Sequence, residues 1–418
     1  MNLLFPPLSD AASGGMEKLL PAIDAAFPLK QRFLRELPKN VARLSSLLTK
    51  ERAGLNCGYM SDPVLLNAYL RYFLPWNVFR LSRLLPSLSL DAVSFDMALG
   101  RAGAPAGAVE IVDLGSGPLT LPIAFWIALP ELRAVPLRFI CVDQSDAALN
   151  AGKKLFSELT ARDGMVENTE NTENAKNCVW QIKTRRAAIG ERLLINFAAS
   201  ASLVCAVNVC NEMFQKIPQA DTESLSAAAQ KFSKLLLDLA GGTGRILVLE
   251  PGAPRPAQFL HFMRKALIDQ GCGIEAPCFA PDKCPMRGGR RGHKWCHFNV
   301  DTNDAPAALH KLSAKALLPK EKVTLSFLLA AKKFRKKAAG RLLNARVISD
   351  AFLLPENKLG RYACSEEGLT LIRGNRALVE KYRQGSSFQV ERPSMMPRDA
   401  KSGAVILNLE DAALAINN

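Results

Sequence analysis

The sequence contains no apolar run long enough to cross a membrane. A membrane-spanning helix needs roughly 20 predominantly apolar residues, whereas the best candidate, Leu119 to Leu129, is short and contains Pro122. The first residues carry no cationic flank of the kind that precedes a secretory signal. Acidic residues precede the first arginine, Arg32, which is atypical of a mitochondrial transit peptide. These absences predict a cytoplasmic protein without a membrane partner.

Acidic residues are scarce relative to basic ones. The chain has 54 Lys and Arg against 39 Asp and Glu, a formal net charge of +15. Such a surplus favours polyanionic partners, either RNA or an anionic membrane surface, and charge alone does not distinguish them. The ten cysteines, in a chain without a secretory signal, indicate thiols or metal ligands rather than disulfides. Cys141, Cys205 and Cys210 lie in apolar runs and are interpreted as packing residues.

With 418 residues, the chain is too long for one hydrophobic core. Helix-like apolar spacing dominates the first part, and short apolar strands alternate with helices from Ala108, which predicts a doubly wound parallel sheet. The expected strands are Val109–Leu114, Leu137–Val142, Cys178–Lys183, Leu203–Val207, Arg245–Leu249 and Val323–Ala330. The expected units are a helical domain at 1–95, an α/β domain at 96–335 with a cysteine-bearing insertion at about 271–299, a small β-rich segment at 336–392 and a tail at 393–418.

A glycine turn follows the first expected strand, in the sequence DLGSGP. Gly115 and Gly117 would let a ligand approach the backbone, and the next helix offers its N-terminal N–H groups. Asp143 closes the following strand, where a carboxylate accepts hydrogen bonds from ribose hydroxyls, although an acid there is also an ordinary helix cap. Asp113, Gly115, Gly117 and Asp143 together resemble the first two motifs of class I S-adenosylmethionine (SAM) methyltransferases. Leu119 replaces a further glycine of that pattern, and a branched side chain there could crowd the adenosyl group.

The position where a catalytic group is expected carries no recognisable one. The strand ending near Val207 is followed by NVCNEM, which contains neither an Asp/Asn-Pro-Pro-aromatic motif nor a Pro-Cys nucleophile. Cys210 is interpreted as a packed thiol, and Glu212 as either a general base or an acid stabilised by the helix dipole. No catalytic residue is assigned.

Four later cysteines form a candidate metal site, in the segments APCFAPDKCP, WCHF and RYAC. Four thiolates complete a tetrahedral zinc site or a cubane cluster. The wide spacing of Cys278, Cys284, Cys296 and Cys364 favours iron–sulfur but does not exclude zinc. Cys272 is a substitute ligand, and His293 and His297 are candidates for a zinc version.

These motifs, with LEPGAPR and RVISD, resemble the methyltransferase-like family of mitochondrial and bacterial small-ribosomal-subunit proteins, the methyltransferase-like protein seventeen group. The resemblance covers roughly residues 35 to 390. It implies a class I, Rossmann-like methyltransferase core, with the helical domain before it and the C-terminal β-rich segment linked to it by the four-cysteine site. It further implies a [4Fe–4S] cluster on these cysteines, bound SAM, and rRNA of the small subunit as partner during assembly.

We rank an assembly factor first and leave catalysis open; the alternative is an active rRNA methyltransferase with a structural zinc site. A small-molecule methyltransferase would leave the positive charge and the cysteines unexplained. Two basic segments near the cysteines predict the RNA-binding surface. Its expected residues are Lys332, Lys333, Arg335, Lys336, Lys337, Arg290 and Arg291.

Overall fold

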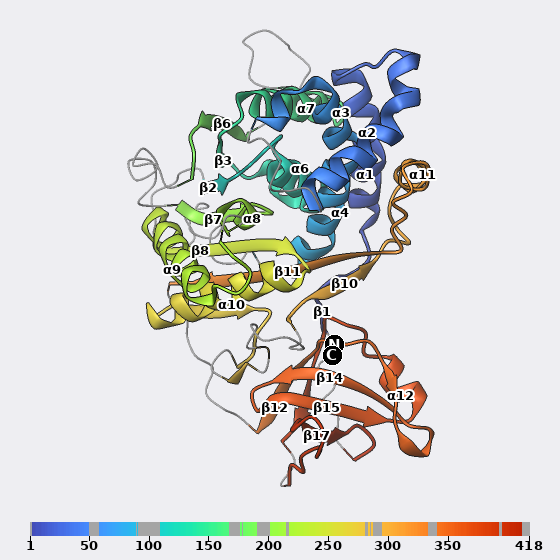
Figure 1. The fold of residues 1–418 in the computed structure, drawn as a ribbon, viewed down its shortest axis with the longest axis vertical. Helices are drawn as coiled ribbons and strands as arrows, with labels where there is room; N and C mark the ends of the chain where they lie inside the picture. Colours follow the sequence, from blue (N-terminus) through green and yellow to red (C-terminus); the bar gives the residue numbers. More distant parts are fainter. Residues whose placement is uncertain are drawn as a thin grey trace.

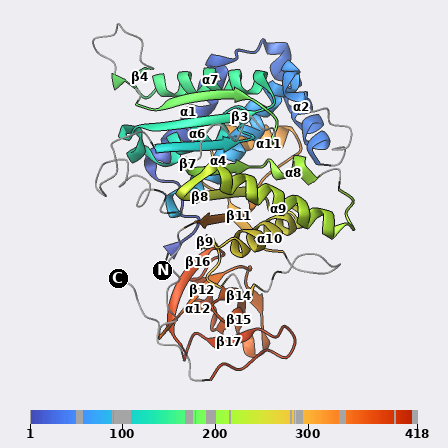
Figure 2. The same cartoon turned by 90° about the vertical axis from the view of Figure 1, so that its left-hand side faces the viewer.

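The computed structural model describes residues 2–411 except 50–57, 89, 91–108, 167–175, 178, 190–200, 215–216, 281–282, 285, 287–294, 333–340 and 393–394. Two bodies lie one above the other in Figures 1 and 2. The upper body is a twisted sheet with helices on both faces, and the lower body is a small barrel of strands.

The larger sheet confirms the predicted α/β architecture. Its strands are β2 (Val109–Leu114), β3 (Leu137–Asp143), β6 (Gln181–Arg186), β7 (Ala201–Val207), β8 (Ala240–Pro251), β9 (Gly273–Ala276), β10 (Phe298–Asp301) and β11 (Lys322–Ala331). They are ordered β10-β11-β8-β7-β2-β3-β6, with β9 also paired to β11. β11 runs antiparallel to β8, β9 and β10, whereas the other pairs among these described strands are parallel. The strand order reverses between β2 and β7, so a ligand crevice is expected at their carboxyl ends.

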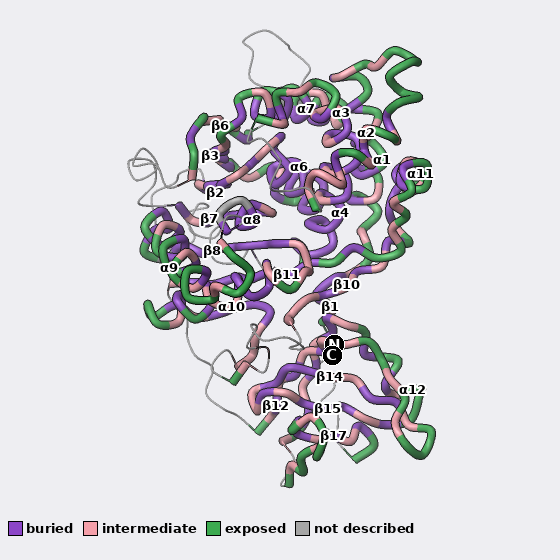
Figure 3. Tube along the Cα trace, viewed as in Figure 1, coloured by how far each residue is buried: buried purple, intermediate pink, exposed green. Residues whose placement is uncertain are grey.

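Side chains on alternate positions of each strand enter two different cores. On β2, Ile111 joins the core under the N-terminal helices, whereas Val112 joins the core under α9 and α10. The helices are α1 (Asp10–Ala26), α2 (Gln31–Thr49), α3 (Pro63–Ala68), α4 (Leu74–Leu84), α6 (Thr120–Ala128), α7 (Asp146–Ala161), α8 (Cys210–Phe214), α9 (Thr222–Leu239), α10 (Pro254–Asp269) and α11 (Ala307–Lys315). All residues of α6 are buried, as Figure 3 shows. Over the described ranges, no helix is both long and apolar enough to cross a membrane.

The lower body is a second sheet that curls into a barrel. Its strands are β12 (Leu342–Val347), β13 (Phe352–Leu353), β14 (Leu359–Ser365), β15 (Gly368–Gly374), β16 (Ser386–Glu391) and β17 (Val405–Asn408), with α12 (Arg376–Glu380) between β15 and β16. β12 pairs with both β14 and β16, β14 pairs with β15, and β17 lies parallel to β15. This order, with a helix between the third and fourth main strands, is the Greek-key arrangement of an OB-fold.

Both ends of the described chain contribute to this barrel. β1 (Asn2–Leu3) pairs with β16, so the first residues add an outer strand. The apolar piece at residues 404–407, expected within a tail, forms most of β17. Leu407 and Leu409 lie in the barrel core.

Candidate cofactor and metal sites

The glycine turn after β2 is held open by two left-handed glycines. Gly115 has φ of 69° and Gly117 has φ of 53°, a region that side chains disfavour. At Gly115 an added Cβ would lie 2.3 Å from Cγ2 of Val209. Just before the turn, the buried Asp113 carboxylate accepts a 2.5 Å hydrogen bond from the Ser116 hydroxyl. Asp113 therefore supports the turn from within the core.

Asp143 ties this turn to the end of β3. One carboxylate oxygen accepts the Gly117 N–H at 2.9 Å, and the other accepts the Ser145 N–H at 2.8 Å. Burial raises the pKa of Asp143, and these backbone hydrogen bonds oppose the rise. Burial also raises the pKa of Asp113, to about 7. A carboxylate accepts about four hydrogen bonds, so Asp143 retains capacity for a ligand hydroxyl beside its backbone contacts with Gly117, Ser145 and Gln144.

Leu119 does not occupy the glycine turn with its side chain. The residue is left-handed, with φ of 58°, and it is fully buried in the core that includes α6 and α7. Its Cγ lies 2.5 Å from the position that a Cβ would take on Gly152 of α7. The branched Leu119 side chain, which could have crowded an adenosyl group, is thus packed against α7. That helix can approach closely because it has a glycine, Gly152, at the contact.

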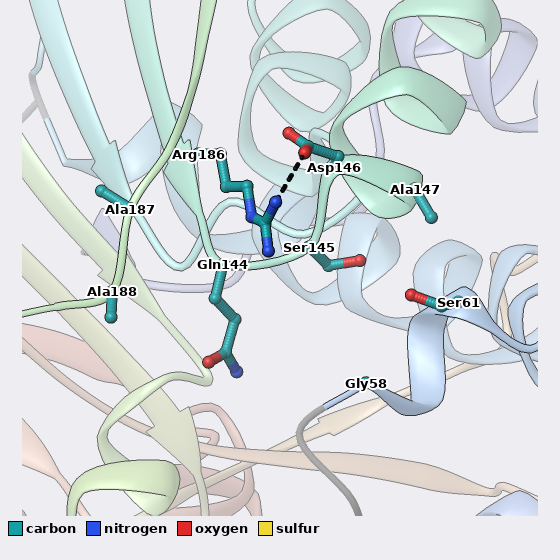
Figure 4. A pocket seen from close by; sticks show the side chains of 9 residues that line it. All are labelled: Gly58, Ser61, Gln144, Ser145, Asp146, Ala147, Arg186, Ala187 and Ala188. Carbon is teal, nitrogen blue, oxygen red and sulfur yellow. Dashed lines mark hydrogen bonds and ion pairs between the residues drawn. The ribbon is translucent and has the colours of Figure 1, made fainter.

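A pocket of about 700 Å³ opens directly after Asp143. Figure 4 shows its lining, in which the Gln144 and Arg186 side chains come from the ends of neighbouring strands and Arg186 points toward Asp146. The Arg186 guanidinium and the Asp146 carboxylate form a 3.4 Å ion pair, and both side chains are largely exposed. The volume is within the range of small-molecule sites. The remaining lining residues are Gly58, Ser61, Ser145, Ala147, Ala187 and Ala188.

The four predicted cysteines come from both bodies and lie near one another. Cys278 and Cys284 follow β9, Cys296 precedes β10, and Cys364 lies on β14 of the barrel. Burial raises the pKa of Cys364 to about 12, and the neighbouring Cys278 and Cys284 raise it further. Burial likewise raises the pKa of Cys296 well above its ordinary value, with contributions from the other three thiols.

Two arginines accompany these thiols. Arg264 of α10 places a guanidinium nitrogen 3.7 Å from the Cys278 sulfur. Burial lowers the pKa of Arg264, but Cys278 and Cys284 outweigh that effect and raise it overall. Arg346 of β12 donates to the Pro277 carbonyl at 3.0 Å. The cluster of thiols is therefore bordered by positive charge from each body.

The described residues contain no group of three or more His, Cys, Asp or Glu side chains with metal-binding geometry. Cys278, Cys284 and Cys296 line a small cavity of about 40 Å³. Cys272 is packed in the core under α9 and α10, and the ring of His297 is stacked on Trp295. His293 lies outside the described residues.

A comparison with protein-family models shows which family this chain belongs to. The model described as "Mitochondrial small ribosomal subunit Rsm22" matches residues 110–395, well over half of the chain. The chain belongs to the Rsm22 family. Among curated proteins, none matches this chain.

Solved methyltransferases are distant structural relatives of this Rsm22-family chain. Magnesium protoporphyrin IX methyltransferase from Synechocystis PCC 6803 with bound SAM has 14% identity over 67% of this chain and 99% of its own, with a TM-score of 0.32. Geranyl diphosphate C-methyltransferase from Streptomyces coelicolor A3(2) has 13% identity over 62% and 84%, with a TM-score of 0.28. The ribosomal protein L11 methylase of Lactobacillus delbrueckii subsp. bulgaricus has 14% identity over 44% and 70%, with a TM-score of 0.24. The fold assignment rests on the strand order itself.

The end of β7 in this Rsm22-family chain contains an inert thiol beside a buried acid. Burial, together with Glu250, raises the pKa of Cys210 well above its ordinary value, so the thiol stays protonated. The Cys210 N–H donates to the Glu250 carboxylate at 2.8 Å. The interpretation of Cys210 as a packed thiol agrees with this geometry. The side chain of Glu212 is outside the described residues.

Sequence reasoning missed two N-terminal residues, Arg80 beside this strand end and Tyr69 near Asp143 at the end of β3. Arg80 of α4 is buried and donates to Asn208 at 3.3 Å. Its pKa falls to about 10 because of burial, and Glu250 opposes the fall. Tyr69 begins a π-helical turn, Tyr69–Phe73, and burial raises its pKa to about 12, with Asp143 among the neighbours that raise it. A π turn is often found at functional sites, but its register is not readable from sequence.

Of the predicted RNA-binding residues, only Lys332 is described, and its amine donates to the Ala240 carbonyl at 2.7 Å. Lys333, Arg335, Lys336, Lys337, Arg290 and Arg291 lie outside the described residues.

Proposed function

We propose that this Rsm22-family chain is a cytoplasmic small-subunit assembly factor that binds SAM, an iron–sulfur cluster and rRNA. The observation that carries the SAM assignment is the double backbone contact of Asp143. That contact fixes a carboxylate beside the glycine turn, and the residues that directly follow Asp143 line the pocket of about 700 Å³. Asp113, Gly115 and Gly117 shape the turn, and Asp143 accepts the ribose hydroxyls.

Calorimetry with SAM tests this assignment. Replacing Asp143 by Ala removes the ribose acceptor and should weaken binding by roughly 1–3 kcal/mol. Asp269→Ala is the matched control, because Asp269 lies outside the pocket lining and its carboxylate pairs with Lys265 at the surface. The SAM assignment is wrong if the wild-type protein gives no binding heat at millimolar SAM.

Cys278, Cys284, Cys296 and Cys364 are the proposed ligands of a [4Fe–4S] cluster. Their thiols interact electrostatically across the two bodies, and Arg264 and Arg346 would offset the negative charge of four thiolates. Soft thiolate donors suit iron–sulfur chemistry. When bound, the cluster supplies four covalent links, one of them to the barrel.

Anaerobic purification followed by iron, sulfide and zinc assays tests the cluster. We expect visible absorption and near-stoichiometric iron and sulfide, which a Cys→Ser change at any of the four should abolish. Cys272→Ala is the matched control and should keep the colour, because Cys272 lies in a hydrophobic core. Stoichiometric zinc without iron or sulfide would instead favour the structural zinc alternative.

The catalytic alternative is tested on rRNA. The protonated, buried Cys210 supports a role without a cysteine nucleophile. A methyl group present in rRNA from a complemented strain and missing from a deletion strain would establish an active methyltransferase. Equal methylation in both strains would support the assembly role.

Binding of rRNA rests on the net charge and on family membership. Each phosphate that a cation neutralises releases counterions, so affinity should fall steeply with salt. Replacing Lys333, Lys336 and Lys337 by Glu should flatten that slope. An unchanged slope would locate the phosphate-binding surface elsewhere.

A further inference from the structure

The barrel has a face that the cofactor and metal sites do not use. In an OB-fold, oligonucleotides bind over the second and third strands, between the loop that joins strands one and two and the loop that joins strands four and five. Here those strands are β14 and β15. The bordering loops are the β12–β14 loop (residues 348–358) and the loop that follows β16.

One end of this face is covered by the cysteine-bearing loop. The Lys283 carbonyl lies 3.2 Å from the position that a Cβ would take on Gly368, and the Lys283 amine pairs with Glu367. Cys364 lies at this same end and faces the other cysteines. A ligand on the barrel face is thereby restricted to the other end, near the β12–β14 loop.

That other end carries a pair of half-buried aromatic rings. Phe352, in β13 of the loop, and Tyr362 of β14 have ring centroids 5.1 Å apart at an interplanar angle of 34°. The Phe352 ring lies over Gly360: a Cβ added to Gly360 would lie 3.1 Å from Cε2 of Phe352. Tyr362 and Gly360 are two positions apart on one strand, so they share the outer face, opposite Ala363 of the barrel core.

Apolar and cationic groups border the rings. Leu353, beside Phe352, is 69% exposed, and Met395, on the loop after β16, is 81% exposed. Arg373 is the cross-strand partner of Gly360 and so lies on the same face. Its Nε is buried and has no hydrogen-bond partner in the part of the chain that is described. Exposed apolar side chains on both framing loops, together with a cation on β15 at the face that Gly360 shares, suit a ligand that has flat rings and negative charge.

We propose that Phe352 and Tyr362 form a stacking platform for unpaired bases of single-stranded RNA, with Arg373 beside the backbone phosphates. Stacking on aromatic side chains is the general means by which proteins hold single strands, and it needs no particular base. The rings of a paired duplex are buried in its own stack, so the platform selects unpaired segments. The proposal rests on the proposed binding of rRNA and names the form of RNA that this surface takes.

The test uses the full-length protein and two labelled probes, a short single-stranded oligouridylate and an RNA duplex, followed by fluorescence anisotropy. Phe352→Leu and Tyr362→Leu keep apolar bulk but remove the ring. Each should weaken single-strand binding on the order of tenfold and leave duplex binding unchanged. Phe33→Leu is the matched control, because Phe33 is an exposed ring on α2, in the other body.

A second measurement does not depend on the variants folding. Ultraviolet crosslinking of the wild-type protein to the single strand should yield adducts on the peptides that contain Phe352 or Tyr362. Wild-type protein that binds neither probe would refute the proposed rRNA function itself. A different result would overturn only the platform. In that case the wild-type protein binds RNA, both variants bind the single strand as tightly as wild type, and the crosslinks lie on other peptides.

Discussion

The residues of the glycine turn lie close together in the sequence, whereas the four cysteines lie far apart along the chain. The turn draws all its residues from one β–α–β unit, and the hydrogen bonds of Asp143 are with its own neighbouring loops. The cluster draws three cysteines from the sheet body and one from the barrel. The turn itself forms when one unit folds, whereas the proposed metal site would form only when the two bodies dock.

This difference decides which perturbations each site tolerates. A local site is fixed by backbone geometry, so it is sensitive to added side-chain atoms. A long-range site holds distant segments together, so it is sensitive to the loss of a link, and metal binding contributes directly to folding free energy. The predictions below separate the two cases.

The largest effect is expected for Cys364→Ser. Losing this proposed ligand should release the barrel from the sheet body and lower the unfolding temperature of both, because the proposed link across the bodies would disappear. Calorimetric unfolding of anaerobic protein, with limited proteolysis of the barrel, measures it. Cys272→Ala should behave like wild type. An unfolding temperature unchanged by Cys364→Ser would show that docking does not depend on the cluster.

A smaller effect is expected for Gly115→Ala. The substitution combines a left-handed φ with a clash against Val209, so we expect a loss of roughly 2–5 kcal/mol in the free energy of unfolding. Gly164→Ala is the matched control, since Gly164 has φ of 76° and nothing within 4 Å of an added Cβ. Urea unfolding measures both. Equal losses at the two positions would mean that Val209 relaxes and the turn is less rigid than it looks.

The smallest effect, for a change of one pH unit, is a dependence on pH. Burial raises the pKa of Asp113 from 3.8 to about 7, so between these values the folded chain binds a proton that the unfolded chain does not. Stability from this group is therefore present at low pH and is lost as pH rises through that window, by at most about 1.4 kcal/mol per pH unit. Asp113→Asn should remove this slope in urea unfolding. Parallel pH profiles for the two proteins would contradict the raised pKa.

The sequence predicts the local site better than the long-range features. The strands at Val109–Leu114 and Leu137–Asp143 appear where apolar runs predict them, because each run and its glycine turn are contiguous. The strand expected at Cys178–Lys183 begins three residues later, at Gln181. Polar residues on its exposed side make its boundaries less distinct.

The barrel could not be predicted in the same way. Its six short strands and β1 gain stability only from pairing with segments far away, and residues 404–407 have too little local pattern to reveal a strand. The same holds for Arg80, which reaches the end of β7, and for Tyr69, which lies near Asp143 at the end of β3. Both belong to helices that precede the whole sheet. Their contribution follows from tertiary packing, not from a motif.

The pairing of β1 with β16 has a consequence for synthesis on the ribosome. Asn2 lies opposite Ser387, so β1 has no partner until β16, 385 residues later, has emerged. At roughly 5–20 residues per second, that wait is on the order of 20 to 80 s. During this time the sheet body can fold, but the edge that β1 completes remains open. Docking of β1 is thus a late event, which follows the synthesis of the whole sheet body.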